Sequence, residues 1–266
     1  MSLAEKIDDA PLLEERDAHG VLRLTLNRPS ARNALSLGLL AALIEALERA
    51  GGDKESRVVV IAGAGPAFCA GHDLRELRAD PRRETYARAF TQSSELMQAI
   101  VRLPKPVIAE VHGIATAAGC QLVASCDLAV AADDAQFATP GVNIGLFCST
   151  PMVALTRAVG RKAAMEMLLT GDLVDAATAK SLGLVNRVVP ASELRRATDA
   201  LARQIADKSA FSVALGKEAF YRQAELDLAA AYAYASEVMT NNMLAADAEE
   251  GIDAFIEKRK PVWRDG

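Results

Sequence analysis

The chain has 266 residues, of which 51% are hydrophobic and 24% charged, and it carries a net charge of −5. This size and composition suit one large or two small globular domains with a full core. The acidic balance, with a pI near 5.4, argues against a nucleic-acid partner, because such proteins usually present a basic face. No apolar run reaches the length of a membrane span, so we expect no membrane partner either.

The cysteines and the N-terminus indicate the compartment. The four cysteines form no C-x-x-C pair and no zinc-type spacing, so we expect reduced thiols and no metal site. They are Cys69, Cys120, Cys126 and Cys148. The first 17 residues are acidic and lack both a signal-peptide core and the Arg-rich composition of a transit peptide. These features predict a cytoplasmic protein.

In the first half of the chain, predicted strands alternate with predicted helices. Asp17–Gly20 is a hairpin signal between two short strands. Ser36 is a good N-cap for the first long helix, which Gly51 and Gly52 end. The patterns predict strands at residues 12–16, 21–26, 57–62 and 106–111, and helices at 37–50 and 81–103.

The second half continues this alternation and then becomes wholly helical. Strands are predicted at 128–132, 136–139 and 184–189, helices at 120–126, 152–159, 161–170 and 176–182, and an irregular segment at 140–151. After residue 190 the strand signals stop, and helices are predicted at 192–207, 212–223, 226–246 and 248–260. We therefore expect a layered α/β core over residues 1–195 and a C-terminal helical region over 196–266.

Two turns rich in small residues follow two of the predicted strands. One is Gly63–Asp73 (GAGPAFCAGHD), and the other is Gly113–Gly119. N–H groups at a helix start lack partners and carry partial positive charge, so such turns can hold a phosphate, a carboxylate or a polarised carbonyl oxygen. Small residues equally let a helix and a strand pack closely. If the two strands are neighbours, one N–H from each turn converges on a single oxygen, which suits a thioester enolate.

Other site types have little support. A dinucleotide fingerprint would need glycine where Phe68 stands, and the chain contains no P-loop, no G-x-S-x-G and no H-E-x-x-H. His72 can donate a hydrogen bond or titrate, but its position favours an ordinary loop histidine. Cys148 is expected to be a packing residue rather than a nucleophile, since nothing in the sequence points to a lowered pKa.

Several ordered motifs resemble the crotonase (enoyl-CoA hydratase/isomerase) superfamily along nearly the whole chain. They are NRPSARNALS, AFCAGHDL, VHGIATAAGCQLVASCDLAVAADDAQFATP, ALTRAVGRKAAMEMLLTGD and FIEKRKPVW. The resemblance implies an α/β fold with a ββα spiral core and a C-terminal helical trimerisation region. It also implies acyl-CoA ligands, no cofactor beyond the coenzyme A of the substrate, and a homotrimer or a dimer of trimers.

The resemblance also implies site residues. The oxyanion hole would be the backbone N–H groups of Ala70 and Ala118, the second of which replaces the usual glycine. The substrate- and CoA-binding residues would be Arg32, Asn33, Ala34, Ala70, Gly71, His72, Asp73 and Lys258.

The chain departs from the family at both catalytic glutamates. Gln121 stands at the first position and Gly141 at the second, and Cys148 stands where some dienoyl-CoA isomerases carry another acid. Glu76 is a nearby carboxylate, but a poor candidate for a substitute base. Each general acid or base typically contributes about 10²–10⁴ in rate, so ordinary hydration should be weak or absent. A non-catalytic acyl-CoA binder, a regulatory oligomer and a different thioester reaction stay open as alternatives.

Overall fold

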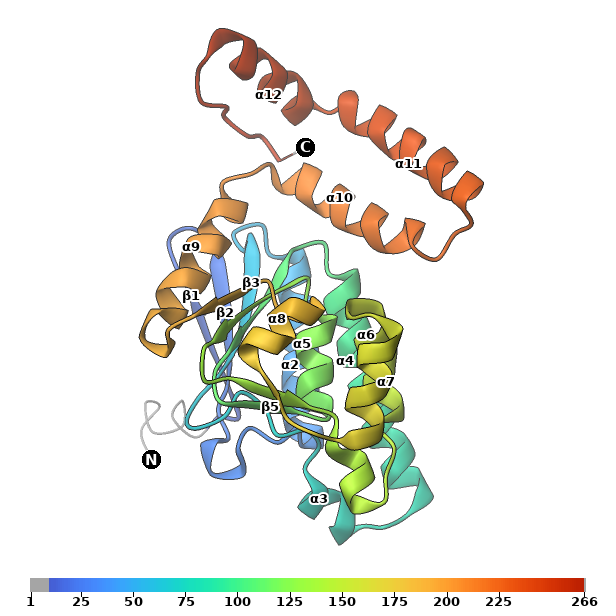
Figure 1. Cartoon of the computed structure of the whole chain (residues 1–266). Coiled ribbons are helices and arrows are strands. Elements are labelled where there is room, and N and C mark those ends of the chain that lie inside the picture. The colour runs from blue at the N-terminus through green and yellow to red at the C-terminus, as the bar shows by residue number, and fades with distance from the viewer. Residues whose placement is uncertain (1–9, 266) are drawn as a thin grey trace.

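The core of the molecule is a six-stranded sheet with the strand order β1-β2-β3-β4-β6-β9 (Figure 1). In the computed structural model, which describes residues 10–265, β1 pairs with β2 in antiparallel register and each following pair is parallel. The strands are β1 (Leu12–Arg16), β2 (Val21–Leu26), β3 (Val58–Gly63), β4 (Val107–Val111), β6 (Leu128–Ala132) and β9 (Arg187–Val189). Residues 1–9 belong to the acidic N-terminal segment on which the prediction of a cytoplasmic location was partly based, and they lie outside this range.

A smaller sheet has the order β5-β7-β8. Its strands are β5 (Ile114–Thr116), β7 (Gln136–Ala138) and β8 (Val174–Asp175). The second small-residue turn therefore contains a short strand, which the sequence did not predict. Strands in two sheets with helices between them agree with the spiral architecture that the motifs implied.

Helices cover the main sheet on both faces. One face packs against the group that comprises α2 (Leu37–Gly52), α4 (Arg83–Arg102), α5 (Ala118–Ser125), α6 (Ser149–Ala158), α7 (Arg161–Thr170) and α8 (Ala176–Leu182). The opposite face packs against α9 (Leu194–Ala206). Short helices lie at α3 (Leu74–Ala79), η1 (Pro29–Ala31), η2 (Pro140–Ile144) and η3 (Ala191–Glu193).

Coverage of both faces explains the continuous apolar run in β3. Val58 and Val60 face α9, whereas Val59 and Ile61 face the other helices, and all four are fully buried. A strand buried on both sides has no wet face and so does not alternate.

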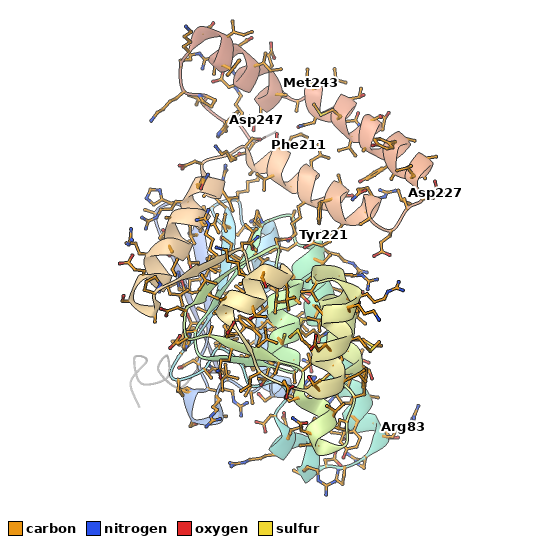
Figure 2. All side chains as sticks on the ribbon, in the orientation of Figure 1. Arg83, Phe211, Tyr221, Asp227, Met243 and Asp247 are labelled. Carbon is orange, nitrogen blue, oxygen red and sulfur yellow. The ribbon has the colours of Figure 1, made fainter. Side chains whose placement is uncertain are left out.

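The last three helices project from the core as an arm (Figures 1 and 2). They are α10 (Ala210–Gln223), α11 (Leu228–Met243) and α12 (Ala246–Glu257), and neither α10 nor α11 has a buried residue. The expected boundary at residue 195 assigned α9 to this region. Because α9 packs on the sheet, the core instead ends near Ser209, at the start of α10.

Candidate functional site

The two small-residue turns lie against each other, as the parallel pairing of β3 with β4 requires. The N–H of Cys69 donates to the Ile114 carbonyl, and the N–H of Thr116 donates to the Cys69 carbonyl, both at 3.0 Å. A Cβ built on Gly119 would lie 2.1 Å from the Cys69 carbonyl oxygen. Glycine is therefore required at residue 119, because the first turn packs directly on the first residues of α5.

Both turns present N–H groups without a backbone acceptor among residues 10–265, among them those of His72 and Ala118. Ala118 is the first residue of α5, where helical N–H groups have no intrahelical partner. In the first turn, the carbonyl of Gly71 and the N–H of Asp73 both bond to Leu35, which leaves the N–H of His72 facing away from Leu35 without an acceptor. A Cβ on Gly71 would lie 3.4 Å from the Ala118 nitrogen, so the two turns are adjacent at this point.

The expected oxyanion donor at Ala70 is wrong. The N–H of Ala70 donates to the Arg32 carbonyl at 3.0 Å and is not available to a ligand. Arg32 and Asn33 both have left-handed backbone conformations, with φ of 50° and 55°. Their turn directs the carbonyl toward the first small-residue turn, and sequence motifs do not reveal this bond.

Asn33 is a structural residue rather than part of a CoA-binding surface. Its side chain is fully buried, and its Nδ2 donates to the carbonyls of Ala64 and Ala67 at 2.8 and 2.7 Å. Its Oδ1 accepts from the N–H of Arg28 at 2.8 Å. These bonds fix the first turn, so the Asn33 side chain is not free to contact a ligand.

Asp73 is likewise engaged within the protein. It is the N-cap of α3 and accepts from the N–H groups of Arg75 and Glu76, while Arg28 ion-pairs with it at 2.8 Å. Burial alone would raise the pKa of Asp73, but Arg28 and the capping N–H groups outweigh burial and hold the pKa below its usual value. The carboxylate caps α3 and orients the turn.

Four further residues have distinct positions. The Glu76 carboxylate accepts from the N–H of Leu37 at 2.9 Å at the start of α2, so it is not a free base. Ala34 gives its carbonyl to the Arg28 guanidinium, whereas the Arg32 side chain is exposed beside this loop. Lys258 ends α12, which lies at the opposite end of the molecule from α3 (Figure 1). One chain therefore does not bring Lys258 to its own site.

Gln121 is a buried side chain with an unused acceptor. It is 4% exposed, and its Oε1 has no hydrogen-bond partner within the described part of the chain. Gln121 follows Ala118 by one helical turn, and helical side chains lean toward the N-terminus, so its amide lies over the start of α5. An unsatisfied buried acceptor costs about 1–3 kcal/mol. This oxygen can accept a hydrogen bond from a ligand, but it cannot act as a base near neutral pH.

Gly141 leaves no empty space where the second glutamate would stand. A Cβ on Gly141 would lie 2.9 Å from the Cys148 sulfur and 2.9 Å from the Leu146 carbonyl oxygen. Burial raises the pKa of the Cys148 thiol, against the opposing effect of the N–H of Gly141, so the sulfur is a neutral thiol. The position is filled by packing, and it offers no carboxylate.

The imidazole of His72 is a feature that sequence reasoning undervalued. Its Nε2 is buried without a partner in the described residues, and its ring meets Phe90 edge-on at a centroid distance of 5.3 Å. Burial lowers the pKa of His72, so the ring is neutral at pH 7. In the sequence, the sign that His72 belongs to the site is that it directly follows Gly71 of the turn.

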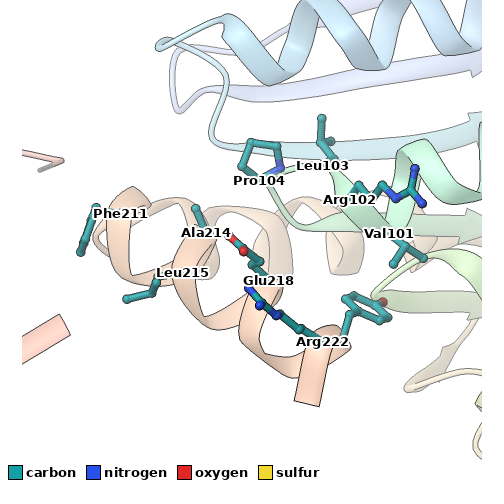
Figure 3. Close-up of a pocket in the computed structure, with 10 residues that line it drawn as sticks. Val101, Arg102, Leu103, Pro104, Phe211, Ala214, Leu215, Glu218 and Arg222 are labelled. Carbon is teal, nitrogen blue, oxygen red and sulfur yellow. The ribbon is translucent and has the colours of Figure 1, made fainter. Parts of the chain in front are cut away.

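Two cavities open near these elements. One of about 450 Å³ lies between α4, α5 and α6 and includes Gln121 in its lining. A larger cavity of about 640 Å³ lies between α10 and residues 101–104 (Figure 3). Within residues 10–265, no cluster of three potential metal ligands occurs, and no helix combines the length and hydropathy needed to cross a bilayer.

Comparison with known proteins places the chain in a family. The profile described as Enoyl-CoA hydratase/isomerase matches residues 16–266. Enoyl-CoA hydratase domain-containing protein 3, mitochondrial, is 49% identical in Xenopus laevis (97% of this chain, 87% of the relative) and 49% identical in Homo sapiens (93% and 82%).

Solved structures support the same family assignment. An enoyl-CoA hydratase from Mycobacterium smegmatis has a TM-score of 0.94 at 57% identity and covers 96% of this chain and 99% of its own. The human domain-containing protein 3 has a TM-score of 0.92 at 48% identity, over 96% and 100% of the two chains.

These comparisons contradict the expected cytoplasmic location. The curated vertebrate relatives at 48–49% identity are named as mitochondrial proteins. The expectation relied on composition and on the lack of a recognisable address, and the physical properties of a folded domain do not encode its compartment. The fold and the matched residues of this chain show that it belongs to the enoyl-CoA hydratase/isomerase family.

Proposed function

We propose that the protein binds acyl-CoA thioesters and that the N–H groups of Ala118 and His72 hold the thioester oxygen. One observation carries this proposal: the N–H groups of His72 and Ala118 lie in two adjacent turns and have no backbone acceptor in the described chain. Donors fixed in this way stabilise negative charge that develops on a carbonyl oxygen, as in a thioester enolate. Family membership supports the ligand class.

The proposed reaction is of the hydratase/isomerase type, but ordinary hydration is weak or absent. Hydration needs groups that hold and deprotonate a water, and the site offers an amide at Gln121 and no side chain at Gly141. Each such group is worth about 10²–10⁴ in rate. Oxyanion polarisation alone then accounts for whatever turnover occurs. We propose no cofactor beyond the coenzyme A carried by the substrate.

A second candidate function is non-catalytic acyl-CoA binding. The packing of Cys148 and Leu146 around Gly141 favours it, because the second acid position is filled and not merely unoccupied. The site then binds and protects the thioester without converting it.

We also propose that the protein works as a homotrimer or a dimer of trimers. The arm exposes large apolar side chains that a second copy of the chain would cover, among them Phe220 at 65%, Leu244 at 81% and Phe255 at 85% exposure. Exposed apolar surface of this extent marks an interaction site. In such an assembly Lys258 would meet the site of a neighbouring copy.

The test uses a panel of acyl-CoA thioesters with thermal denaturation and product analysis. A ligand at 100 times its Kd stabilises the folded state by about 2.7 kcal/mol, so a binding thioester raises the melting temperature. Free coenzyme A and the free acids serve as controls for the thioester itself. Crotonyl-CoA hydration within tenfold of an ordinary hydratase would contradict the missing acids. Mass analysis of the panel separates an enzyme from a binder.

A further inference from the structure

The cavity of about 450 Å³ lies along three helices, and its lining includes Gln121, one helical turn from the proposed donor Ala118. α5 begins at Ala118 itself, and α6 begins directly after Cys148, which contacts Gly141. α4 follows the first turn and α3, and then leads back to the start of β4. Residues early in these helices therefore lie toward the two turns, and residues late in them lie toward the opposite edge of the sheet.

The residues that line the cavity differ in polarity between its inner end, its walls and its outer end. Gln121, in the first turn of α5, lies at the inner end, with its unpartnered buried oxygen. Arg102 is the last residue of α4, and Arg157 belongs to the last turn of α6. The walls between these ends include Met97, Val101, Ala124, Val153 and Ala154.

The helical rise gives the length of the cavity. Ser94 and Arg102 both line it and are eight residues apart, which corresponds to about 12 Å at 1.5 Å per residue. On α6, Thr150 and Arg157 are seven residues apart, or about 10 Å. An extended acyl chain of roughly eight to ten carbons, with C–C bonds of about 1.5 Å, spans this distance.

The outer end carries more positive than negative charge. Arg102 donates to the Gln98 amide oxygen at 2.9 Å and forms no ion pair with a carboxylate in residues 10–265. Arg157 meets Glu225 at 3.4 Å, with both side chains more than 60% exposed, so this pair is loose. Glu225 is the one carboxylate in the lining, against two guanidinium groups; Glu218 faces Arg102 only from the neighbouring larger cavity.

We infer that this cavity takes an acyl chain that ends in a carboxylate, so the preferred ligands are CoA thioesters of medium-chain dicarboxylic acids. The inference deepens the proposed function and rests on it, because the thioester must lie at Ala118 and His72. The apolar walls hold the methylene chain, and the distal carboxylate pairs with Arg102 and Arg157. Such charge-assisted bonds to guanidinium groups are shorter and stronger than neutral ones.

The experiment compares two thioesters of equal length on the full chain by titration calorimetry. One is octanoyl-CoA, and the other is the mono-CoA thioester of the eight-carbon dicarboxylic acid. An exposed ion pair contributes up to about 1 kcal/mol, so two such pairs should make the dicarboxylic thioester bind up to about tenfold more tightly at low salt. This advantage should shrink as salt is added.

Matched variants locate the effect. Arg102→Gln and Arg157→Gln should each reduce the advantage several-fold, and together abolish it, with the affinity for octanoyl-CoA within about twofold of wild type. Arg88→Gln is the control, since Arg88 is also exposed on α4 but lies outside this cavity. It should keep the full advantage.

Three results would overturn the inference. Equal affinity for the two thioesters in the wild type, with both still binding, refutes the carboxylate preference and leaves the proposed function intact. An advantage that survives the double variant Arg102→Gln, Arg157→Gln places the carboxylate elsewhere. Failure of both thioesters to bind refutes the proposed function itself, and the inference with it.

Discussion

The sulfur of Cys148 lies where a side chain at residue 141 would begin, because a Cβ on Gly141 would be 2.9 Å from it. The Leu146 carbonyl oxygen lies at the same distance, and a backbone oxygen in a packed turn cannot rotate away. The segment that leads into α6 thus closes the place of the second family glutamate. The missing acid is a property of the whole loop and not of one substitution.

Gly141→Glu should therefore fail to create a hydratase. Overpacking of a close contact typically costs about 1–3 kcal/mol, and we expect the free energy of unfolding to fall by this amount. Gln121→Glu is the matched change, since glutamate has the same shape as glutamine and fits the existing space. Chemical denaturation measures the stability of both variants, and a crotonyl-CoA hydration assay measures their activity. A stable and hydrating Gly141→Glu protein would show that the loop opens.

Ala117→Gly should stabilise the protein. Ala117 precedes the proposed donor Ala118 and has φ 51° and ψ −116°, a conformation that favours glycine. Release of this strain should raise the free energy of unfolding by about 1 kcal/mol. Ala124→Gly, in the last turn of α5, should instead lower it by up to about 1 kcal/mol, the helix propensity difference between the two residues. Equal destabilisation by both changes would show that Ala117 is not strained.

His72 should make stability fall as the solution becomes acidic. Burial lowers the pKa of His72 from 6.5, so the unfolded state binds more protons than the folded state between the two pKa values. The stabilisation is complete above pH 6.5 and is lost as the pH falls toward the folded pKa. His72→Phe should flatten the stability profile in this window, and the exposed His19→Gln should not. An unchanged slope in His72→Phe would assign the effect to another group.

Lys217→Met should detach the arm from the core. The Lys217 ammonium donates to the carbonyls of Ile100 and Lys105 at 2.8 and 2.9 Å and pairs with Asp127 at 2.6 Å. Loss of one partner of a buried ion pair costs about 3–5 kcal/mol. Limited proteolysis near Ser209 and the sedimentation coefficient should both change. Lys180→Met, at an exposed position on α8, is the control.

The sequence predicted the fold well where local patterns determine structure. The strands at β1, β2 and β6 and the helix that starts at Ser36 match the patterns closely, because hydrophobic period and capping residues are local signals. The short strand β5 was missed, since Ile114–Thr116 is defined by its pairing with β7 and with Cys69 and has no pattern of its own. The position of α9 was also missed, because a helix pattern does not identify the face on which it packs.

The candidate site could be predicted only in outline. The two turns are recognisable in the sequence, and their adjacency follows once the two strands before them are taken as neighbours, but the N–H groups that stay free do not. Which N–H is free depends on long-range bonds, such as that from Ala70 to the Arg32 carbonyl. The hydrogen bonds of the Asn33 and Asp73 side chains were not predicted for the same reason, because motifs record residue types and not hydrogen-bond partners.

A crystal structure with a bound acyl-CoA thioester tests the central claim most directly. We expect the thioester oxygen within about 2.7–3.1 Å of both the His72 and the Ala118 backbone nitrogens. A thioester oxygen bound elsewhere, or one that meets only one of these two nitrogens, would contradict the proposed site.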